Sequence, residues 1–170
     1  RNKNESDHIG FSIQSCIDIF HKPEIIIVDN NSNDDSLEIA NLFNDRTPIK
    51  FTTINEYSPG KSINAGVKLA SHDTILVLSA HSQIIKCDLD LIFEYLKKFK
   101  AVFGNQIPVY RGKKISKRYI WSHFGSSKEV NMFSKIENRY FLHNAFCFYN
   151  KQFLQQHPMP ENYPGKEDRF

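Results

Sequence analysis

The chain has 170 residues, a length that suits one domain with a hydrophobic core of its own. Apolar residues make up 40% of it and charged residues 24%, both ordinary for a globular protein. The formal charge of +3 is too small and too dispersed for a nucleic-acid-binding protein, and no apolar run approaches the roughly 18 residues that a membrane span requires.

Three cysteines lie far apart and form no paired motif, which predicts a reducing, cytoplasmic location; they are Cys16, Cys87 and Cys147. No signal peptide is visible in the sequence, which opens directly on the polar stretch Arg1–Glu5 and stops at Phe170 directly after a charged motif. We therefore expect a fragment of a longer protein, truncated at both ends, in the cytoplasm or at the inner face of the membrane.

Helix and strand patterns alternate along the first hundred residues. Apolar residues recur at helical spacing from Ile9 to Phe20, with Ser6 or Asp7 as the expected N-cap. Four consecutive β-branched residues within Glu24–Asp29 are typical of a strand buried on both faces. The next expected elements are a polar turn at 30–35, a helix at 37–43, a strand at 49–53, a helix at 63–70, a strand at 74–78, a helix opened by Asp88 and a strand at 101–109. This alternation predicts an α/β fold, with a mostly parallel sheet flanked by helices.

The pattern changes after residue 109. Residues 110–140 are polar, aromatic and weakly periodic, Phe141–Tyr149 is apolar enough for a strand, and three prolines and a glycine predict a loop at 157–166. A basic cluster opens this half, either as a solvated loop, which such clusters usually are, or as a contact for an anionic acceptor or a membrane surface. Its members are Arg111, Lys113, Lys114, Lys117 and Arg118.

Two polar groups follow buried strands, at the carboxyl ends where open α/β sheets bind ligands. The first is Asp29–Asp34, where a carboxylate can accept hydrogen bonds from a base or a ribose, although Asp, Asn and Ser are equally favoured there as a helix cap and turn. The second is Ser79-Ala80-His81, whose neutral imidazole either holds a divalent cation on a diphosphate or bonds a loop carbonyl. No other pair of histidines has metal-ligand spacing, which argues against a structural zinc site.

Two further motifs carry charge. Gly60-Lys61-Ser62 is similar to the end of a phosphate-binding loop, but Asn55 occupies the position where that motif requires glycine. We therefore reject a nucleoside triphosphatase, while a phosphate contact at this helix N-terminus stays open. Near the end of the chain, Glu167-Asp168-Arg169 either is a solvated charge run or supplies the carboxylate that takes a proton from an acceptor hydroxyl.

Taken in order, these motifs resemble a family-2 glycosyltransferase, and the resemblance covers nearly the whole chain. The matched residues are Asn4, Glu5, 24–34, Gly60, Asn64, Gly66, 75–81, Glu167 and Asp168. The resemblance implies a Rossmann-like GT-A fold whose first strand would lie just before Arg1. It also divides the single domain 1–170 into a nucleotide-sugar-binding half, 1–109, and an acceptor-side half, 110–170.

The resemblance implies roles for individual residues. Asp29 would hydrogen-bond the base of the donor, and Asp168, beside Glu167, would deprotonate the acceptor hydroxyl so that its attack inverts the anomeric carbon. The donor-binding residues would be Arg1, Asn2, Glu5, Asp29, Asn30, Ser32, Lys61, Asn64, Ser79 and Ala80. His81 would bind a divalent cation, Mn²⁺ or Mg²⁺, or contact the diphosphate directly. The acceptor side would include Arg118, Trp121, His143 and Asn144.

The chain departs from the family at the metal-binding acidic triplet, which Ser79-Ala80-His81 replaces. The resemblance implies aspartate at both ends of this triplet, where this chain has Ser79 and His81. The expected function is transfer of a sugar from a nucleotide-diphosphate donor to a glycan or lipid-linked acceptor in surface polysaccharide biosynthesis, with peripheral membrane association and no nucleic-acid partner. Two alternatives stay open. One is a catalytically inactive sugar-nucleotide-binding module, which Ser79 favours and Glu167-Asp168 argues against. The other, well below it, is a sugar-phosphate nucleotidyltransferase, whose glycine-rich loop is missing.

Overall fold

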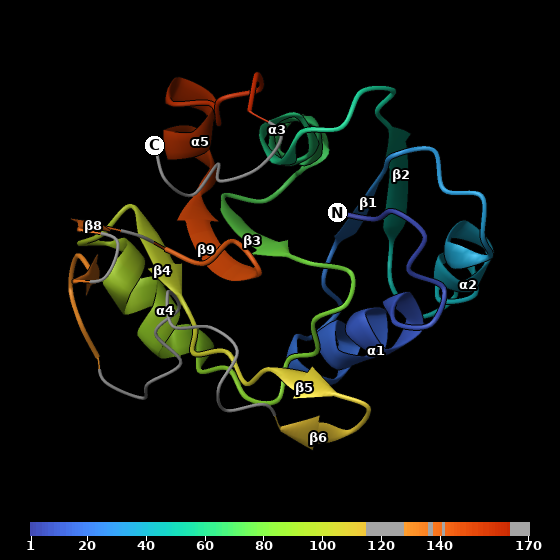
Figure 1. Ribbon diagram of the computed structural model, residues 1–170, viewed down its shortest axis with the longest axis horizontal. Helices are drawn as coiled ribbons and strands as arrows, with labels where there is room; N and C mark the ends of the chain where they lie inside the picture. Colours follow the sequence, from blue (N-terminus) through green and yellow to red (C-terminus); the bar gives the residue numbers. More distant parts are fainter. Residues whose placement is uncertain (115–127, 136–137, 141, 164–170) are drawn as a thin grey trace.

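The computed structural model describes residues 1–114, 128–135, 138–140 and 142–163. Its centre is a layer of five β-strands with helices on both faces (Figure 1). The strands of this layer are β1 (Ile25–Asp29), β2 (Ile49–Thr53), β3 (Thr74–Leu78), β4 (Ala101–Phe103) and β9 (Phe146–Asn150). The helices are α1 (Ile9–Ile19), α2 (Ser36–Asn41), α3 (Pro59–Leu69), α4 (Leu89–Leu96) and α5 (Lys151–Gln156). Two short hairpins lie outside the layer, β5 (Val109–Tyr110) with β6 (Lys113–Lys114) and β7 (Phe133–Ser134) with β8 (Arg139–Tyr140).

Four of the five central strands run in the same direction. β2 pairs in parallel with β1, whereas β9 lies between β3 and β4 and pairs antiparallel with both. Arg1 and Asn2 connect β1 to β3 in the parallel pattern. The Asn2 amide donates to the Val28 carbonyl (2.9 Å), and the Ala80 amide donates to the Arg1 carbonyl (3.2 Å). The predicted α/β fold with a mostly parallel sheet is therefore confirmed, with β9 as the reversed strand.

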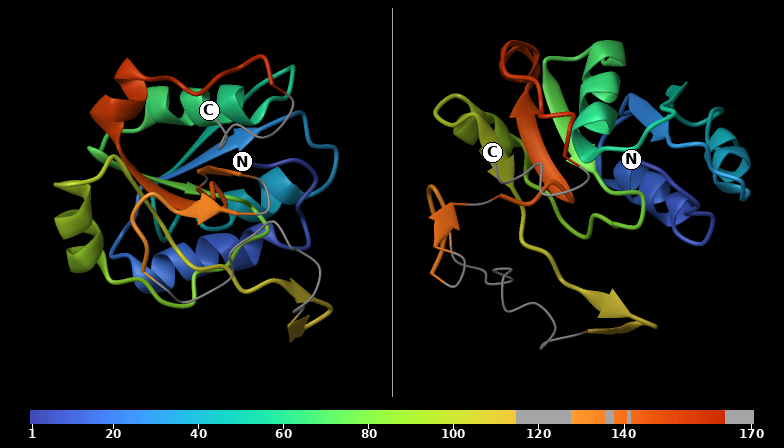
Figure 2. Two further views of the ribbon diagram at one scale, coloured as in Figure 1. Left: turned by 60° about the vertical axis from the view of Figure 1, so that its left-hand side comes forward. Right: turned by 45° about the horizontal axis from the view of Figure 1, so that its top comes forward.

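The helices cover the two faces of the layer because each carries apolar residues at helical spacing. α1 and α2 lie on one face, and α3 and α5 lie on the other (Figure 2). Ile9 and Ile13 of α1 join one buried cluster, and Ile63 and Val67 of α3 join a second cluster with the β3 and β9 side chains. None of the helices in the described ranges combines the length and the apolar character that crossing a bilayer requires.

Two local predictions differ from the structure. The N-cap of α1 is His8, without a side-chain hydrogen bond, and neither Ser6 nor Asp7 fills that role. Instead the Glu5 carbonyl accepts from the amides of His8 (2.9 Å) and Ile9 (2.8 Å), so a turn of main chain starts the helix.

The strand expected at 101–109 is also shorter than its apolar pattern suggested. β4 ends at Phe103, and the next residue, Gly104, crosses so close to Phe146 that an added Cβ would lie 2.5 Å from its ring. Pro108 then has no amide hydrogen to contribute to a ladder. Within the described residues, the strand expected at 141–149 begins at Phe146, and residues 158–163 form a loop as predicted.

Candidate functional site

The segment that begins at Arg1 runs between β1 and β3 (Figure 1). Polar side chains gather on either side of it, where the two strands end. Asp29 is the last residue of β1, and Ser79-Ala80-His81 follows β3 directly. Since both strands run the same way, their carboxyl ends meet at one edge of the layer, which is where open α/β sheets bind ligands. The first five residues of the chain pass between the two ends and contact both.

The Asp29 carboxylate is the centre of the first group and is only 3% exposed. Its Oδ1 accepts from the Asn2 side-chain amide (2.8 Å) and from the Ser32 hydroxyl (2.5 Å), and its Oδ2 accepts from the Ser32 backbone amide (2.9 Å). The Asn2 amide nitrogen also donates to Ser32, so the other end of that side chain, Oδ1, is an acceptor. This Asn2 oxygen is buried and has no hydrogen-bond partner among the described residues.

The turn after β1 is fastened to the opening segment by a second carboxylate, Asp34. Its oxygens accept from the Ser36 hydroxyl and amide and from the Ser6 amide (2.9 Å). Burial raises the pKa of Asp34, but these hydrogen bonds outweigh burial and lower the pKa to about 2. The Ser36 hydroxyl also accepts from the Glu5 amide (2.8 Å). These bonds hold the two loops in one arrangement without a ligand.

The opening segment makes further hydrogen bonds to the main chain of the turn after β1, and the sequence motifs did not single out Lys3, which donates them. The Lys3 ammonium donates to the carbonyls of Asn30 (2.7 Å) and Asn31 (2.6 Å). Asn4 and Asn31 both adopt left-handed backbone conformations, with φ of 52° and 51°, which asparagine tolerates better than most residues. In the sequence, the feature that could have indicated this part of the site is the high content of Asn, Asp and Ser in the opening segment and in the turn after β1.

Glu5 and His81 form the second group. The His81 Nδ1 lies 2.9 Å from the Glu5 Oε1, and the side chains are 60% and 21% exposed respectively. A carboxylate at Nδ1 favours the tautomer that carries the proton there, which leaves the Nε2 lone pair facing outward. The Nε2 is thereby suited to a cation or to a phosphate that shares a proton.

Ser79 and Ala80 position Arg1 instead of presenting oxygen ligands. The Ser79 hydroxyl is buried and accepts from the Arg1 guanidinium (3.4 Å), while the Ala80 amide bonds the Arg1 carbonyl. Among the residues that the structure describes, no group of three or more His, Cys, Asp or Glu side chains could hold a metal ion. With Nδ1 held by Glu5, His81 can offer one nitrogen, Nε2, so a cation there would need its remaining ligands from a phosphate and water.

The beginning of α3 holds residues 159–161, a segment that lies far away along the chain. The Asn64 side chain donates to the Met159 carbonyl (2.9 Å) and the Glu161 carboxylate (2.8 Å) and accepts from the Met159 amide (2.9 Å). A Cβ added to Gly60 would lie 2.0 Å from the carbonyl oxygen of Pro160. Glycine and asparagine at these positions therefore hold residues 159–161, from which the chain continues toward the late acidic pair.

Several other predicted site residues make contacts within the chain. Lys61 pairs with the exposed Glu56 (3.0 Å), and such exposed pairs exchange readily with other anions. Asn144 is 3% exposed and accepts from the Tyr149 hydroxyl, and the His143 ring packs edge-on against Phe103 with centroids 5.6 Å apart. The remaining predicted residues lie outside the described ranges; they are Arg118, Trp121, Glu167 and Asp168.

Known proteins resemble both the sequence and the fold. The chain is 32% identical over 111 residues to poly-beta-1,6-N-acetyl-D-glucosamine synthase of Staphylococcus epidermidis, a match that covers 60% of this chain and 26% of that protein. Against the same synthase of Staphylococcus aureus strain MSSA476 the identity is 30% over 111 residues. The chain thus spans about a quarter of the length of these curated relatives.

Solved structures show the same GT-A fold. S. aureus TarS superposes with a TM-score of 0.72 at 19% identity, covering 99% of this chain and 31% of TarS. The mannosyltransferase PcManGT of Pyrobaculum calidifontis, solved with GDP-Man and Mn²⁺, gives a TM-score of 0.68 at 13% identity, covering 99% of this chain and 48% of that one. The profile described as glycosyl transferase family 2 matches residues 2–157, so the chain belongs to that family of glycosyltransferases.

Proposed function

We propose that the chain is the donor-binding part of an inverting glycosyltransferase that moves a sugar from a nucleotide diphosphate to a glycan or lipid-linked acceptor in surface polysaccharide biosynthesis. The observation that carries the proposal is the convergence of the Asp29 group and the Glu5–His81 pair at one edge of the sheet. The relatives named as polysaccharide synthases support the pathway, and the TarS complexes with UDP and UDP-GlcNAc support the class of donor.

In this proposal Asn2 and Asp29 recognise the base. The Asn2 Oδ1 is a buried acceptor without a partner among the described residues, and the Asp29 Oδ2 accepts only one of the hydrogen bonds it can form. A uracil ring offers one ring N–H to such acceptors. Because both oxygens are buried, the base must displace part of the turn from Asn30 to Ser32 as it enters.

His81 is proposed to contact the diphosphate. Glu5 holds the ring by its Nδ1, so the Nε2 would meet the diphosphate, either directly or through a divalent cation for which His81 would supply the nitrogen ligand. A bound cation would neutralise part of the negative charge that develops on the departing diphosphate. The Arg1 guanidinium, held by Ser79, and the Lys61 ammonium supply further positive charge in the same role.

Asp168, next to Glu167, is proposed as the general base, on the ground of its place in the family's late acidic pair. The structure supports this proposal through the segment that leads to the pair. Gly60 and Asn64 hold residues 159–161 against α3, a few residues before Glu167. On the acceptor side, Ile107, just before the basic hairpin β5–β6, and Val109, within it, are exposed. We place the contact with a lipid-linked acceptor or an anionic membrane surface there.

Titration calorimetry with UDP and GDP, with and without Mn²⁺, tests the donor site. Asp29→Asn should weaken UDP binding by about 10- to 100-fold, since a hydrogen bond to a charged group contributes about 1.5–3 kcal/mol. His81→Ala should remove the dependence on Mn²⁺, and His157→Ala, an exposed histidine outside the site, is the matched control. Thermal unfolding of each variant separates loss of binding from loss of fold. Equal UDP affinity in all four proteins would contradict the proposal.

A turnover assay tests the catalytic part separately. Asp168→Asn should abolish sugar transfer to the acceptor while donor binding by calorimetry stays within about twofold of the parent, because a general base acts on the acceptor hydroxyl and not on the donor. Tight donor binding without turnover in the parent chain would favour the inactive sugar-nucleotide-binding module instead.

A further inference from the structure

β2 is the outermost strand of the central layer, at the end opposite β4 (Figure 1). One of its edges pairs with β1 along the whole strand. The bonds that flank this ladder show which residues face β1, since the Ile25 amide donates to the Pro48 carbonyl (3.0 Å) and the Ile54 amide donates to the Asp29 carbonyl (2.8 Å). Main-chain groups alternate in direction along a strand, so the odd-numbered residues of β2 point theirs away from β1.

The outward main-chain groups of β2 belong to Ile49, Phe51 and Thr53. The Ile49 amide donates to the Asn44 side chain (3.2 Å), as expected of a group that points away from β1. Within the described ranges, no hydrogen bond reaches the main-chain amide or carbonyl of Phe51 or Thr53. Phe51 is 40% exposed and Thr53 is exposed as well, so this outer edge of β2 is accessible to a partner.

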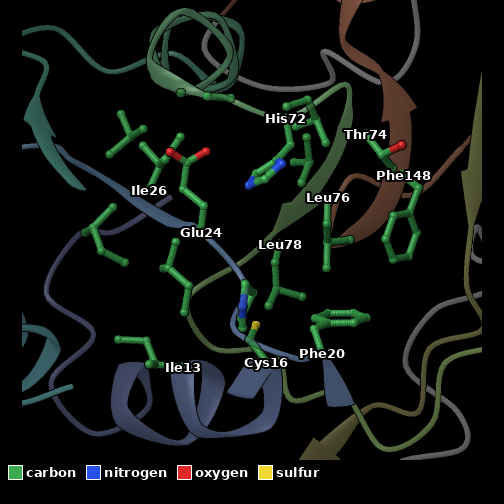
Figure 3. A pocket seen from close by; sticks show the side chains of 18 of the residues that line it. Ile13, Cys16, Phe20, Glu24, Ile26, His72, Thr74, Leu76, Leu78 and Phe148 are labelled. Carbon is green, nitrogen blue, oxygen red and sulfur yellow. The ribbon is translucent and has the colours of Figure 1, made fainter. Parts of the chain in front are cut away.

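The outward-facing positions of β2 carry none of the charges, prolines or bulges that typically protect an edge strand. Pro48 precedes the strand, but its main chain faces β1. Lys50 is the one charged residue of β2, and its ammonium pairs with Glu24 and donates to the Leu69 carbonyl (3.1 Å). Figure 3 shows the Glu24 carboxylate on the α3 side of β1, so Lys50 is directed along a face of the sheet and not over its edge.

We propose that the outer edge of β2 binds the same edge of a second copy of this chain, antiparallel and centred on Phe51. In that register Phe51 is opposite Phe51 and Ile49 is opposite Thr53, so each outward amide meets an outward carbonyl. The Ile49 amide exchanges the Asn44 side chain for the main chain of the second copy. The two copies are related by a twofold axis, the commonest symmetry of protein oligomers.

The dimer joins the two central layers into one continuous sheet. Because the strands of the two copies run in opposite directions, the carboxyl ends that carry Asp29 lie at opposite edges of that sheet. Neither of these edges is covered by the pairing, which requires neither the proposed donor nor the proposed reaction.

The side chains of β2 fit a second copy because the strand is complementary to itself in this register. The two exposed Phe51 rings lie side by side on one face, where a cross-strand aromatic pair is favourable. On the other face, Lys50 is opposite Thr52 and not opposite a second lysine. An unrelated extended peptide would satisfy the main chain equally well, but it would not carry this match of side chains.

The segments that flank β2 are also complementary in charge. Arg46 is exposed before the strand, and the Glu56 side chain is 86% exposed after it, at the same distance along the chain from Phe51. Antiparallel pairing brings the segment before β2 of one copy toward the segment after β2 of the other, so Arg46 lies toward Glu56. Asp45, the carboxylate beside Arg46, lies toward Tyr57, whose hydroxyl can donate to it.

Analytical ultracentrifugation from about 10 µM to about 1 mM tests the pairing, since a single short strand forms a small, transient interface. The parent chain should dimerise at the upper end of this range. Phe51→Lys should weaken self-association at least about tenfold, because it places two like charges side by side at the twofold axis. Leu42→Lys is the matched control and should dimerise like the parent, since Leu42 is 75% exposed and follows α2, outside the edge. Thermal unfolding of both variants shows whether the fold is kept.

Engineered cysteines test the register. Phe51→Cys should link two chains under mild oxidation, because directly opposite residues of a hydrogen-bonded antiparallel pair lie about 5.5 Å apart at their Cα atoms. Thr53→Cys should not link to itself, since Thr53 is opposite Ile49. The parent chain gives the background from Cys16, Cys87 and Cys147.

Hydrogen exchange at the Phe51 and Thr53 amides identifies what covers the edge. Their protection should rise with protein concentration in the parent and not in Phe51→Lys. Protection that is the same at every concentration would show that another part of the same chain covers the edge, and would overturn the proposal. A parent chain that stays monomeric up to about 1 mM would overturn it too. So would Phe51→Lys dimers as stable as those of the parent, or Thr53→Cys links that form as readily as Phe51→Cys links.

Discussion

Replacement of Gly60 by alanine tests how the beginning of α3 holds the segment that leads toward Glu167 and Asp168. The added Cβ would lie 2.0 Å from the carbonyl oxygen of Pro160, and a backbone oxygen cannot rotate away as a side chain can. Overpacking of this kind costs about 1–3 kcal/mol, and the better helix propensity of alanine returns at most about 1 kcal/mol. If residues 159–161 withdraw, the three Asn64 hydrogen bonds are lost as well, each contributing about 1 kcal/mol.

We therefore expect Gly60→Ala to lower the free energy of unfolding by about 2 kcal/mol, which corresponds to a Tm decrease of about 4–8 °C. Gly66→Ala is the matched control in the same helix. Its Cβ would lie 3.4 Å from the Val28 Cγ2, an ordinary contact, so it should stabilise the chain by about 0.5–1 kcal/mol. Urea unfolding gives both values, and hydrogen exchange at the Met159 amide reports whether the segment has moved. Equal stability of the two variants with an unchanged Met159 amide would refute the reasoning.

Two further changes probe the carboxylates that hold the fold and the site. Burial raises the pKa of Glu24, but hydrogen bonds from Lys50 and Ser71 outweigh it and lower the pKa from 4.5 to about 2. This stabilisation is present above pH 4.5 and disappears as the pH falls toward 2. Glu24→Gln should thus cost about 1–2 kcal/mol at pH 7, allowing for the partial exposure of Lys50, and nothing at pH 2, as urea unfolding at both pH values will show. Ser36→Ala should lower the free energy of unfolding by about 1–3 kcal/mol, because the Glu5 amide loses its acceptor. NMR titration of this variant should show a higher pKa for Asp34, since the hydrogen bonds from Ser36 lower that pKa. An unchanged pKa would show that Ser36 is not the cause of the lowering.

Local sequence patterns were sufficient for the strands that frame the site. The β-branched run before Asp29 and the apolar run before Ser79 predicted β1 and β3, because each ends in polar residues that cannot continue a buried strand. Asp88 was expected to open a helix, and its side chain does accept from the Leu91 amide. In these places the local preference and the final packing agree.

Long-range pairing is where the sequence was insufficient. No local pattern indicates that β9 enters between β3 and β4, since that order depends on contacts between residues about 70 positions apart, such as Leu76 and Phe148. The role of Asn64 is of the same kind, because its partners lie 95 and 97 positions later in the chain. Asp29 was expected to present its carboxylate to a ligand, and the sequence could not show that Asn2 and Ser32 occupy most of its acceptor capacity.

The fold and the proposed donor site share one short segment, so the free energy of ordering this segment is linked to the free energy of donor binding. Arg1 and Asn2 bond the main chains of β1 and β3, while their side chains bond Ser79 and Asp29. Any interaction that orders this segment in the sheet therefore also orders the side chains proposed to meet the donor. A donor that binds those side chains must in return favour the ordered segment by the same free energy.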